Sequence, residues 1–134
     1  MTSHPFKPTL EIGRVITDFT NAFSKVFAAF AGQKTRDKIL SLLQPQLTPK
    51  TITDPQLIAA DYERIVQEGV AYEMEEHRVG ICGVAAPIRV ASGEVVASVG
   101  VIVPVERSDS EQMQANAAIV KRIAAAIGDS LSQS

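Results

Sequence analysis

The densest group of chemically active side chains in this sequence is the run Glu73, Glu75, Glu76 and His77. Carboxylates and an imidazole can share a divalent metal ion, and a carboxylate can also act as an acid–base group. The run contains a single histidine, and no second group of ligands follows at a characteristic spacing. A solvated turn between two strands explains the same residues, and we favour it over a metal site.

Cys82 is the one cysteine of the chain and a second candidate for chemistry. A thiol nucleophile needs a base and an orienting third group nearby, and no motif connects Cys82 with His4 or His77. An acid–base site on Glu73 or Glu76 likewise lacks a convergent partner. We therefore expect a buried, unreactive cysteine, no enzymatic activity, no cofactor and no metal.

Gly83 and Gly100 lie inside two apolar segments with the composition of strands. A glycine within a strand often marks a bulge or a place where a ligand approaches closely. Two glycines on neighbouring strands would form a floor without side chains. Tight packing of a helix on the sheet explains them equally well, so the residues alone leave both interpretations open.

The elements that position these residues are two long strands over residues 80–90 and 94–103, joined by a turn at Ala91-Ser92-Gly93. A shorter strand over 70–74 precedes them. Enrichment in Val and Ile between Gly and Ser residues is typical of strands and hairpins. Apolar residues fall on both faces, so we expect helices on one face and a second covering layer, where function would reside, on the other.

Helical spacing and capping signals predict four helices around these strands. The predicted helices cover residues 10–31 after a Thr9 cap, residues 35–43, the segment from Asp54-Pro55 to Gly69, and a last helix opened by a capping box of Ser108 and Glu111. Residues 1–8 read as a loose arm and residues 44–53 as a loop. The order is α-α-α-β-β-β-α in one domain, residues 9–134.

Four of the five phenylalanines fall on one stripe of the first predicted helix: Phe19, Phe23, Phe27 and Phe30. The stripe would cover the domain's own sheet, or pack against its copy in a second chain. A membrane-surface helix is disfavoured because the polar face is not enriched in Lys or Arg.

The bulk properties exclude several classes of protein. A net charge of −2 with scattered basic residues is unlike the dense cationic patch of duplex DNA binding. The N-terminus has no signal-peptide pattern, and no apolar run approaches the ~20 residues of a membrane span. With one cysteine in 134 residues, these features predict a cytoplasmic domain that binds neither nucleic acid nor membrane.

From Leu47 to Leu131 the chain resembles the effector-binding domain of the IclR family of bacterial transcriptional regulators. The matching segments are LTPKTITDPQL, RIVQEGVAYEMEEHRVGICGVAAPI and SGEVVASVGVIVP, followed by an amphipathic helix. Within them, Glu75-Glu76, Gly80 and Val84-Ala85-Ala86-Pro87 fall at the positions of the family's motifs. The spacing holds over some eighty residues, which makes the resemblance fairly specific.

The resemblance implies an α/β fold of the α+β type, with an antiparallel profilin- or GAF-like sheet flanked by helices. It further implies a small organic or aromatic acid as effector and a homo-oligomer, at least a dimer. No winged helix-turn-helix precedes the domain in this chain, and the family's first strands have no counterpart. The family's A-x-G-K stretch is echoed at most by residues 30–34.

The resemblance also supplies pocket positions. Glu73 matches an acidic residue, usually Asp; Gly83 matches the pocket cysteine; and Gly100 and Ile102 match polar positions, often serines. Cys82 lies one residue earlier and should face the opposite side. We therefore expect a roomier and more apolar floor, and a larger or more apolar effector, or none.

Strand alternation then gives a full set of ligand contacts: Glu73, Ile81, Gly83, Ala85, Ser98, Gly100 and Ile102. The opposite parity, Cys82, Val84, Ala86, Val99 and Val101, should pack under helices. The alternative is a degenerate dimerisation or interaction module whose pocket is filled by its own Phe-rich helix.

Overall fold

The computed structural model describes residues 19–42 and 45–133. Its elements follow the order α1(Ala22–Ala29), α2(Gln33–Ser41), α3(Pro55–Glu68), β1(Ala71–Met74), β2(Ile81–Arg89), β3(Val95–Pro104) and α4(Ser110–Ser132), with a short 3-10 turn at Val105–Arg107 before α4. This is the predicted α-α-α-β-β-β-α order. The predicted arm at 1–8, the Thr9 cap and residues 10–18 of the first helix lie outside the described residues.

The three strands form an antiparallel sheet in the order β1-β2-β3. The register pairs Glu73 with Gly83 and Gly83 with Ile102, and the next row contains Ala71, Ala85 and Gly100. An irregularity at Ile88/Arg89 shifts the register near the hairpin end. Because opposed residues in an antiparallel pair share a face, each row places its side chains on one side of the sheet.

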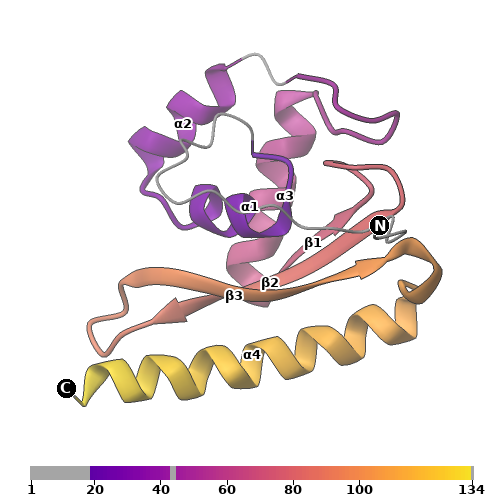
Figure 1. Ribbon diagram of the computed structural model, residues 1–134. Helices are drawn as coiled ribbons and strands as arrows, with labels where there is room; N and C mark the ends of the chain where they lie inside the picture. The colour runs from indigo at the N-terminus through magenta and orange to yellow at the C-terminus, as the bar shows by residue number, and fades with distance from the viewer. Residues whose placement is uncertain (1–18, 43–44, 134) are drawn as a thin grey trace, which may run out of the picture.

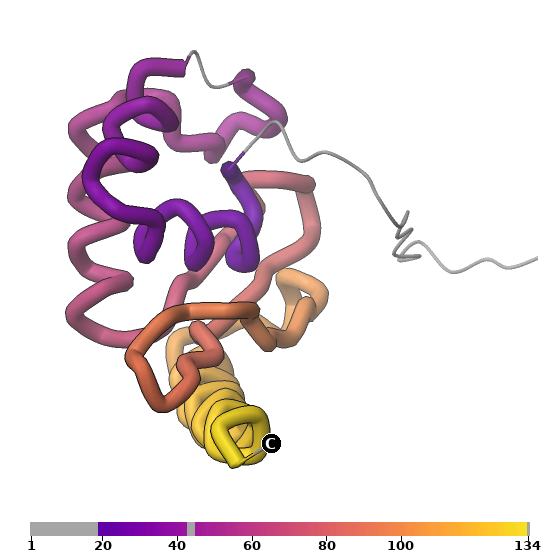
Figure 2. Tube along the Cα trace, turned by 90° about the vertical axis from the view of Figure 1, so that its left-hand side faces the viewer, coloured from indigo at the N-terminus to yellow at the C-terminus, as the bar shows by residue number. Residues whose placement is uncertain are grey.

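Helices cover both faces of the sheet, α1 to α3 one face and α4 the other (Figure 1). Figure 2, turned by 90°, shows α4 end-on beneath the sheet, on the side away from the other helices. The sequence predicted helices on one face of the sheet and an unidentified second layer on the other. That second layer also consists of helices, α1 to α3. Its core contains Val26, Tyr62, Ile65 and Ala85.

The α4 face has its own core, formed by Cys82, Val84 and Ala86 of β2 with Met113, Ala117, Val120 and Ala124 of α4. Val99 and Val101 of β3 pack against it. The predicted parity is thus confirmed, and Cys82 is fully buried on the side opposite Gly83. Gly128 lets α4 approach β2, since a Cβ there would lie 2.2 Å from the Arg89 carbonyl oxygen.

Local hydrogen bonding shifts several helix ends from their predicted places. Asn21 caps α1 by accepting from the Ser24 amide, so residues 19–21 are not helical. At the start of α4, Asp109 and Gln112 form the capping box, one residue after the predicted Ser108 and Glu111. Ser108 instead donates to the Val105 carbonyl. Asp54 caps α3 and Gly69 ends it in the left-handed region, as predicted.

Candidate functional site

The seven predicted ligand contacts lie on one face of the sheet, the face that α1 covers. Glu73, Gly83 and Ile102 form one row across the three strands. Ala85 and Gly100 pair in the next row, Ser98 pairs with Pro87 farther along, and Ile81 with Pro104 at the other end. The structure therefore brings Glu73, Gly83 and Ile102 together and leaves Ser98 near the hairpin end.

Helix α1 lies directly over the centre of this face. A Cβ added to Gly83 would meet the Ala22 Cβ at 3.6 Å, an ordinary packing distance. Gly83 is therefore in the floor of a close helix-on-sheet contact. Ile102 is 43% exposed, so the row opens to solvent at its β3 end.

Gly100 has a different role from the one expected of an open floor. A Cβ at this position would lie 2.4 Å from the Val84 carbonyl oxygen and 3.0 Å from Ala85. Backbone contact with the neighbouring strand explains this glycine, so a larger side chain there would disturb the β2–β3 pairing itself.

Glu73 is buried, with 4% of its surface exposed, and its Oε2 accepts a 3.3 Å hydrogen bond from the Glu76 amide. Burial raises the pKa of the Glu73 carboxyl to about 7, and the nearby Glu76 charge adds to this effect; backbone hydrogen bonds and Lys25 oppose it. Near neutral pH this carboxyl therefore exists in both protonation states.

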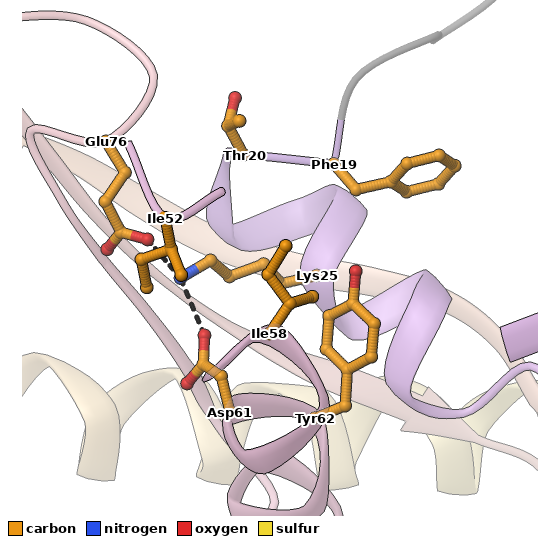
Figure 3. Close-up of a pocket in the computed structure, with 8 residues that line it drawn as sticks. All are labelled: Phe19, Thr20, Lys25, Ile52, Ile58, Asp61, Tyr62 and Glu76. Carbon is orange, nitrogen blue, oxygen red and sulfur yellow. Dashed lines mark hydrogen bonds and ion pairs between the residues drawn. The ribbon is translucent and has the colours of Figure 1, made fainter. Parts of the chain in front are cut away.

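Lys25 is the residue beside the site whose role the sequence did not indicate. Lys25 lies off the phenylalanine stripe in the sequence, yet it is only 4% exposed. The ammonium donates to Asp61 Oδ2 at 2.8 Å, to Glu76 Oε1 at 2.6 Å and to the Tyr72 carbonyl at 3.0 Å. Figure 3 shows it between the two carboxylates. Only the tertiary structure brings these partners from α3 and the β1–β2 turn.

This ion-pair cluster adjoins a small cavity lined by residues of several elements, among them Phe19, Ile52 and Tyr62 (Figure 3). Its volume is about 10 Å³, about the space of one water molecule. Effector sites in proteins are far larger, about 300–1,000 Å³. The cavity beside Lys25 is therefore too small to hold an effector.

The turn after β1 is anchored, which corrects the expectation of a solvated loop. Thr48 and Thr51 each donate at 2.6 Å, to the carbonyls of Glu75 and Glu76. Lys50 lies 2.7 Å from Glu75 and helps to lower the pKa of that carboxyl. Across the described ranges, no group of three or more His, Cys, Asp or Glu is arranged to hold a metal ion.

The phenylalanine stripe forms only part of the core-facing surface around α1. Ala22, Val26 and Ala29 are buried, and Phe19, Phe23 and Phe30 are partly buried and pack against the same core. Phe27 is 62% exposed. The side chain nearest Gly83 is the methyl group of Ala22 and not an aromatic ring. Helix α1 nevertheless occupies the face where an effector was expected.

Comparison with known proteins identifies the family to which this chain belongs. The family model described as "Bacterial transcriptional regulator IclR C-terminal" matches residues 2–129. This chain belongs to the IclR family. The proteins that it matches are transcriptional regulators and the matched domain is regulatory, so the prediction of a non-enzymatic protein is confirmed.

Two relatives show how much of each sequence is matched. An HTH-type regulator from Mycobacterium tuberculosis is 42% identical over 82 residues, 61% of this chain and 31% of the relative. The glycerol operon regulatory protein of Streptomyces griseus is 31% identical over 113 residues, 78% of this chain and 42% of the relative. The chain thus spans less than half the length of these relatives.

The solved structures agree with the fold. A transcriptional regulator from Rhodococcus sp. RHA1 superposes with a TM-score of 0.86 at 26% identity, over 98% of this chain and 53% of that one. The Thermotoga maritima IclR gives 0.77 at 29% identity, over 85% and 47%. The α+β, GAF-like fold predicted from the resemblance is confirmed.

The predicted echo of the family's A-x-G-K stretch, residues 30–34, spans the turn after α1 and the first two residues of α2, Gln33 and Lys34. Helix α1 opens with Ala22-Phe23-Ser24-Lys25, an Ala-x-Ser-Lys sequence that differs from this pattern only by Ser in place of Gly.

Proposed function

We propose that this chain senses a small carboxylic acid for an IclR-type transcriptional regulator, and binds it on the α1-facing side of the sheet at the row Glu73, Gly83 and Ile102. The observation that carries the proposal is the buried Glu73 carboxyl in one row with Gly83 and the half-open Ile102. A neutral Glu73 can donate a hydrogen bond to an effector carboxylate, whereas an ionised Glu73 would repel it.

Solved relatives support the class of ligand. An IclR homologue from Microbacterium hydrocarbonoxydans was solved with 4-hydroxybenzoate, and the inducer-binding domain of PobR from Acinetobacter with 3-hydroxybenzoic acid. These two proteins are 22% and 19% identical to this chain. Their ligands therefore serve here only to select the acids to be tested for binding. Gly83 and Ile102 make this row less polar than the family's pattern, which favours an aromatic or larger apolar acid.

Binding requires α1 to move, because Ala22 covers Gly83. Displacement of this helix would transmit occupancy to the rest of a regulator. We further propose that the chain acts in the cytoplasm as a homo-oligomer and makes no direct contact with DNA. Within the ranges that the structure describes, no helix is long and apolar enough to cross a membrane.

A thermal-shift screen against organic and aromatic acids tests the proposal. An effector at a hundred times its dissociation constant should stabilise the domain by roughly 2.7 kcal/mol, a shift of several degrees. Glu73→Gln retains a neutral donor and should preserve the shift at high pH, and Glu94→Gln, an exposed carboxyl, is the matched control. Tight binding of a compact acid such as glyoxylate would contradict the expected apolar preference.

The second candidate function is an interaction module without a ligand, and the covering of Gly83 by α1 favours it. No stabilisation by any acid in the screen, together with a stable oligomer by light scattering, would support the module and reject the sensor.

A further inference from the structure

The hydroxyl of Tyr62 is a polar group in the interior that the proposed function does not use. Tyr62 lies on α3, is 1% exposed and is one of the residues that line the small cavity beside Lys25. In Figure 3 its hydroxyl points away from α3, toward the side of the cavity where Phe19 and Thr20 lie. The cavity therefore has a hydrogen-bonding group aimed into it.

This hydroxyl stays protonated and has no partner in the protein. Burial raises the pKa of Tyr62 to about 12, with the Asp61 charge adding to this effect and Arg36 opposing it. No residue that the structure describes forms a hydrogen bond with the hydroxyl, whereas every side-chain nitrogen or oxygen that is sealed from solvent has one. The Tyr62 oxygen is therefore left in contact with the cavity. Ordered water satisfies many interior groups of this kind.

The ion pairs next to the cavity favour a neutral occupant. Lys25 uses all three of its ammonium donors on protein acceptors, so none is left for the hydroxyl. Two cations, Lys25 and Arg64, face two carboxylates, Asp61 and Glu76. Because these charges balance, the cluster attracts neither a further cation nor an anion. A neutral molecule that forms hydrogen bonds fits this environment best.

The size and the lining of the cavity specify that molecule further. The volume of about 10 Å³ corresponds to one water molecule, which needs about two to four polar partners. Besides Tyr62, the polar residues of the lining include Thr20, Asp61 and Glu76. An ionised carboxylate has about four acceptor positions, so both carboxylates can still accept from a water after binding their cations.

We propose that this cavity is a binding site for one internal water molecule, held by the Tyr62 hydroxyl and by the polar groups of Thr20, Asp61 or Glu76 around it. These residues belong to the segment that leads into α1, to α3 and to the turn after β1. The water thus connects three segments that are far apart in the sequence. The inference is independent of the proposed function, because no effector takes part in it.

Water magnetic relaxation dispersion, which counts the long-lived internal waters of a protein in solution, tests this site on the native chain and Tyr62→Phe. The substitution keeps the aromatic ring, so the variant should remain folded, which its circular dichroism melt checks. Tyr72→Phe is the matched control. Tyr72 is the other tyrosine of the chain, and it is partly exposed and does not line this cavity.

We expect the native chain and Tyr72→Phe to hold equal numbers of long-lived waters, and Tyr62→Phe to hold one fewer. The equilibrium constant for unfolding in urea should rise about two- to tenfold in Tyr62→Phe, because the hydrogen bond between the hydroxyl and the water is lost. Equal numbers of waters in the native chain and Tyr62→Phe would overturn the site. A Tyr62→Phe variant more stable than the native chain would also overturn it, since removing a hydroxyl from a dry cavity relieves an unpartnered polar group.

Discussion

Lys25 is held by two carboxylates and a carbonyl in a site that excludes most solvent. Asp61 is shared with Arg64, which lies on the surface of α3. The cluster therefore pairs Asp61 and Glu76 with two cations. Each buried group has a partner, and across the described residues no buried side-chain nitrogen or oxygen lacks a hydrogen bond.

Lys25→Met should be strongly destabilising, because it leaves Asp61 and Glu76 without their buried cation. Loss of one member of a buried ion pair costs about 3–5 kcal/mol, measurable by urea denaturation. Lys50→Met is the control, since Lys50 is 64% exposed in its pair with Glu75 and solvent-exposed ion pairs contribute little to stability. Equal losses in both variants would contradict a buried network at Lys25.

Glu73 should make stability fall as the pH rises. Its pKa is raised from 4.5 to about 7 in the folded protein, so the native state binds the proton more tightly than the unfolded chain does. The stabilisation from this proton is complete below about pH 4.5 and is lost as the pH rises through about 7. Glu73→Gln should remove this decline, of about 1–3 kcal/mol, from urea titrations between pH 5 and 8. A native profile that is flat, or equal to that of Glu73→Gln, would contradict the burial of this carboxyl.

At the scale of elements, strand parity and strong capping signals could be predicted from the sequence. Alternation placed Cys82 and Gly83 on opposite faces, and Asp54 with Pro55 located the start of α3. The buried face of α1 could be predicted only in part, because the large apolar residues of a helix normally mark its buried side. Ala22, Val26 and Ala29 form its fully buried centre, since the close approach to Gly83 leaves no room for a ring there, and Phe23 and Phe30 pack at its margin.

The role of Gly100 escaped prediction for a related reason. Sequence shows that a strand glycine is unusual, but only the structure shows whether a ligand, a helix or a neighbouring strand lies against it. For Gly100 it is the β2 backbone. Lys25 was missed because its partners come from segments that are 36 and 51 residues away.

Replacing Gly128 by Ala should change stability in the direction opposite to that of most helix glycines. Gly→Ala within a helix normally stabilises by up to about 1 kcal/mol. A Cβ at position 128 would lie 2.2 Å from the Arg89 carbonyl oxygen, so Gly128→Ala should instead lower stability by about 1–3 kcal/mol in thermal or urea denaturation. Ser130→Ala, at an exposed position of the same helix, should be neutral or slightly stabilising. A stabilised Gly128→Ala variant would contradict the close contact of α4 with β2.

At the scale of the molecule, the two faces of the sheet differ in what covers them. The α4 face is a conventional apolar core, whereas the α1 face contains the buried charges and Glu73. Movement of α1 would expose the row of Glu73, Gly83 and Ile102 without disturbing the core beneath.

Calorimetric titration of an aromatic acid, 4-hydroxybenzoate first, into the native chain at pH 6 and pH 8 tests the central claim most directly. We expect one acid per chain, with an affinity that weakens from pH 6 to pH 8 as Glu73 ionises. In Glu73→Gln this pH dependence should be lost, and in Glu94→Gln it should persist. Binding with the same affinity at both pH values, or none by any aromatic acid up to millimolar concentration, would contradict effector sensing at this row.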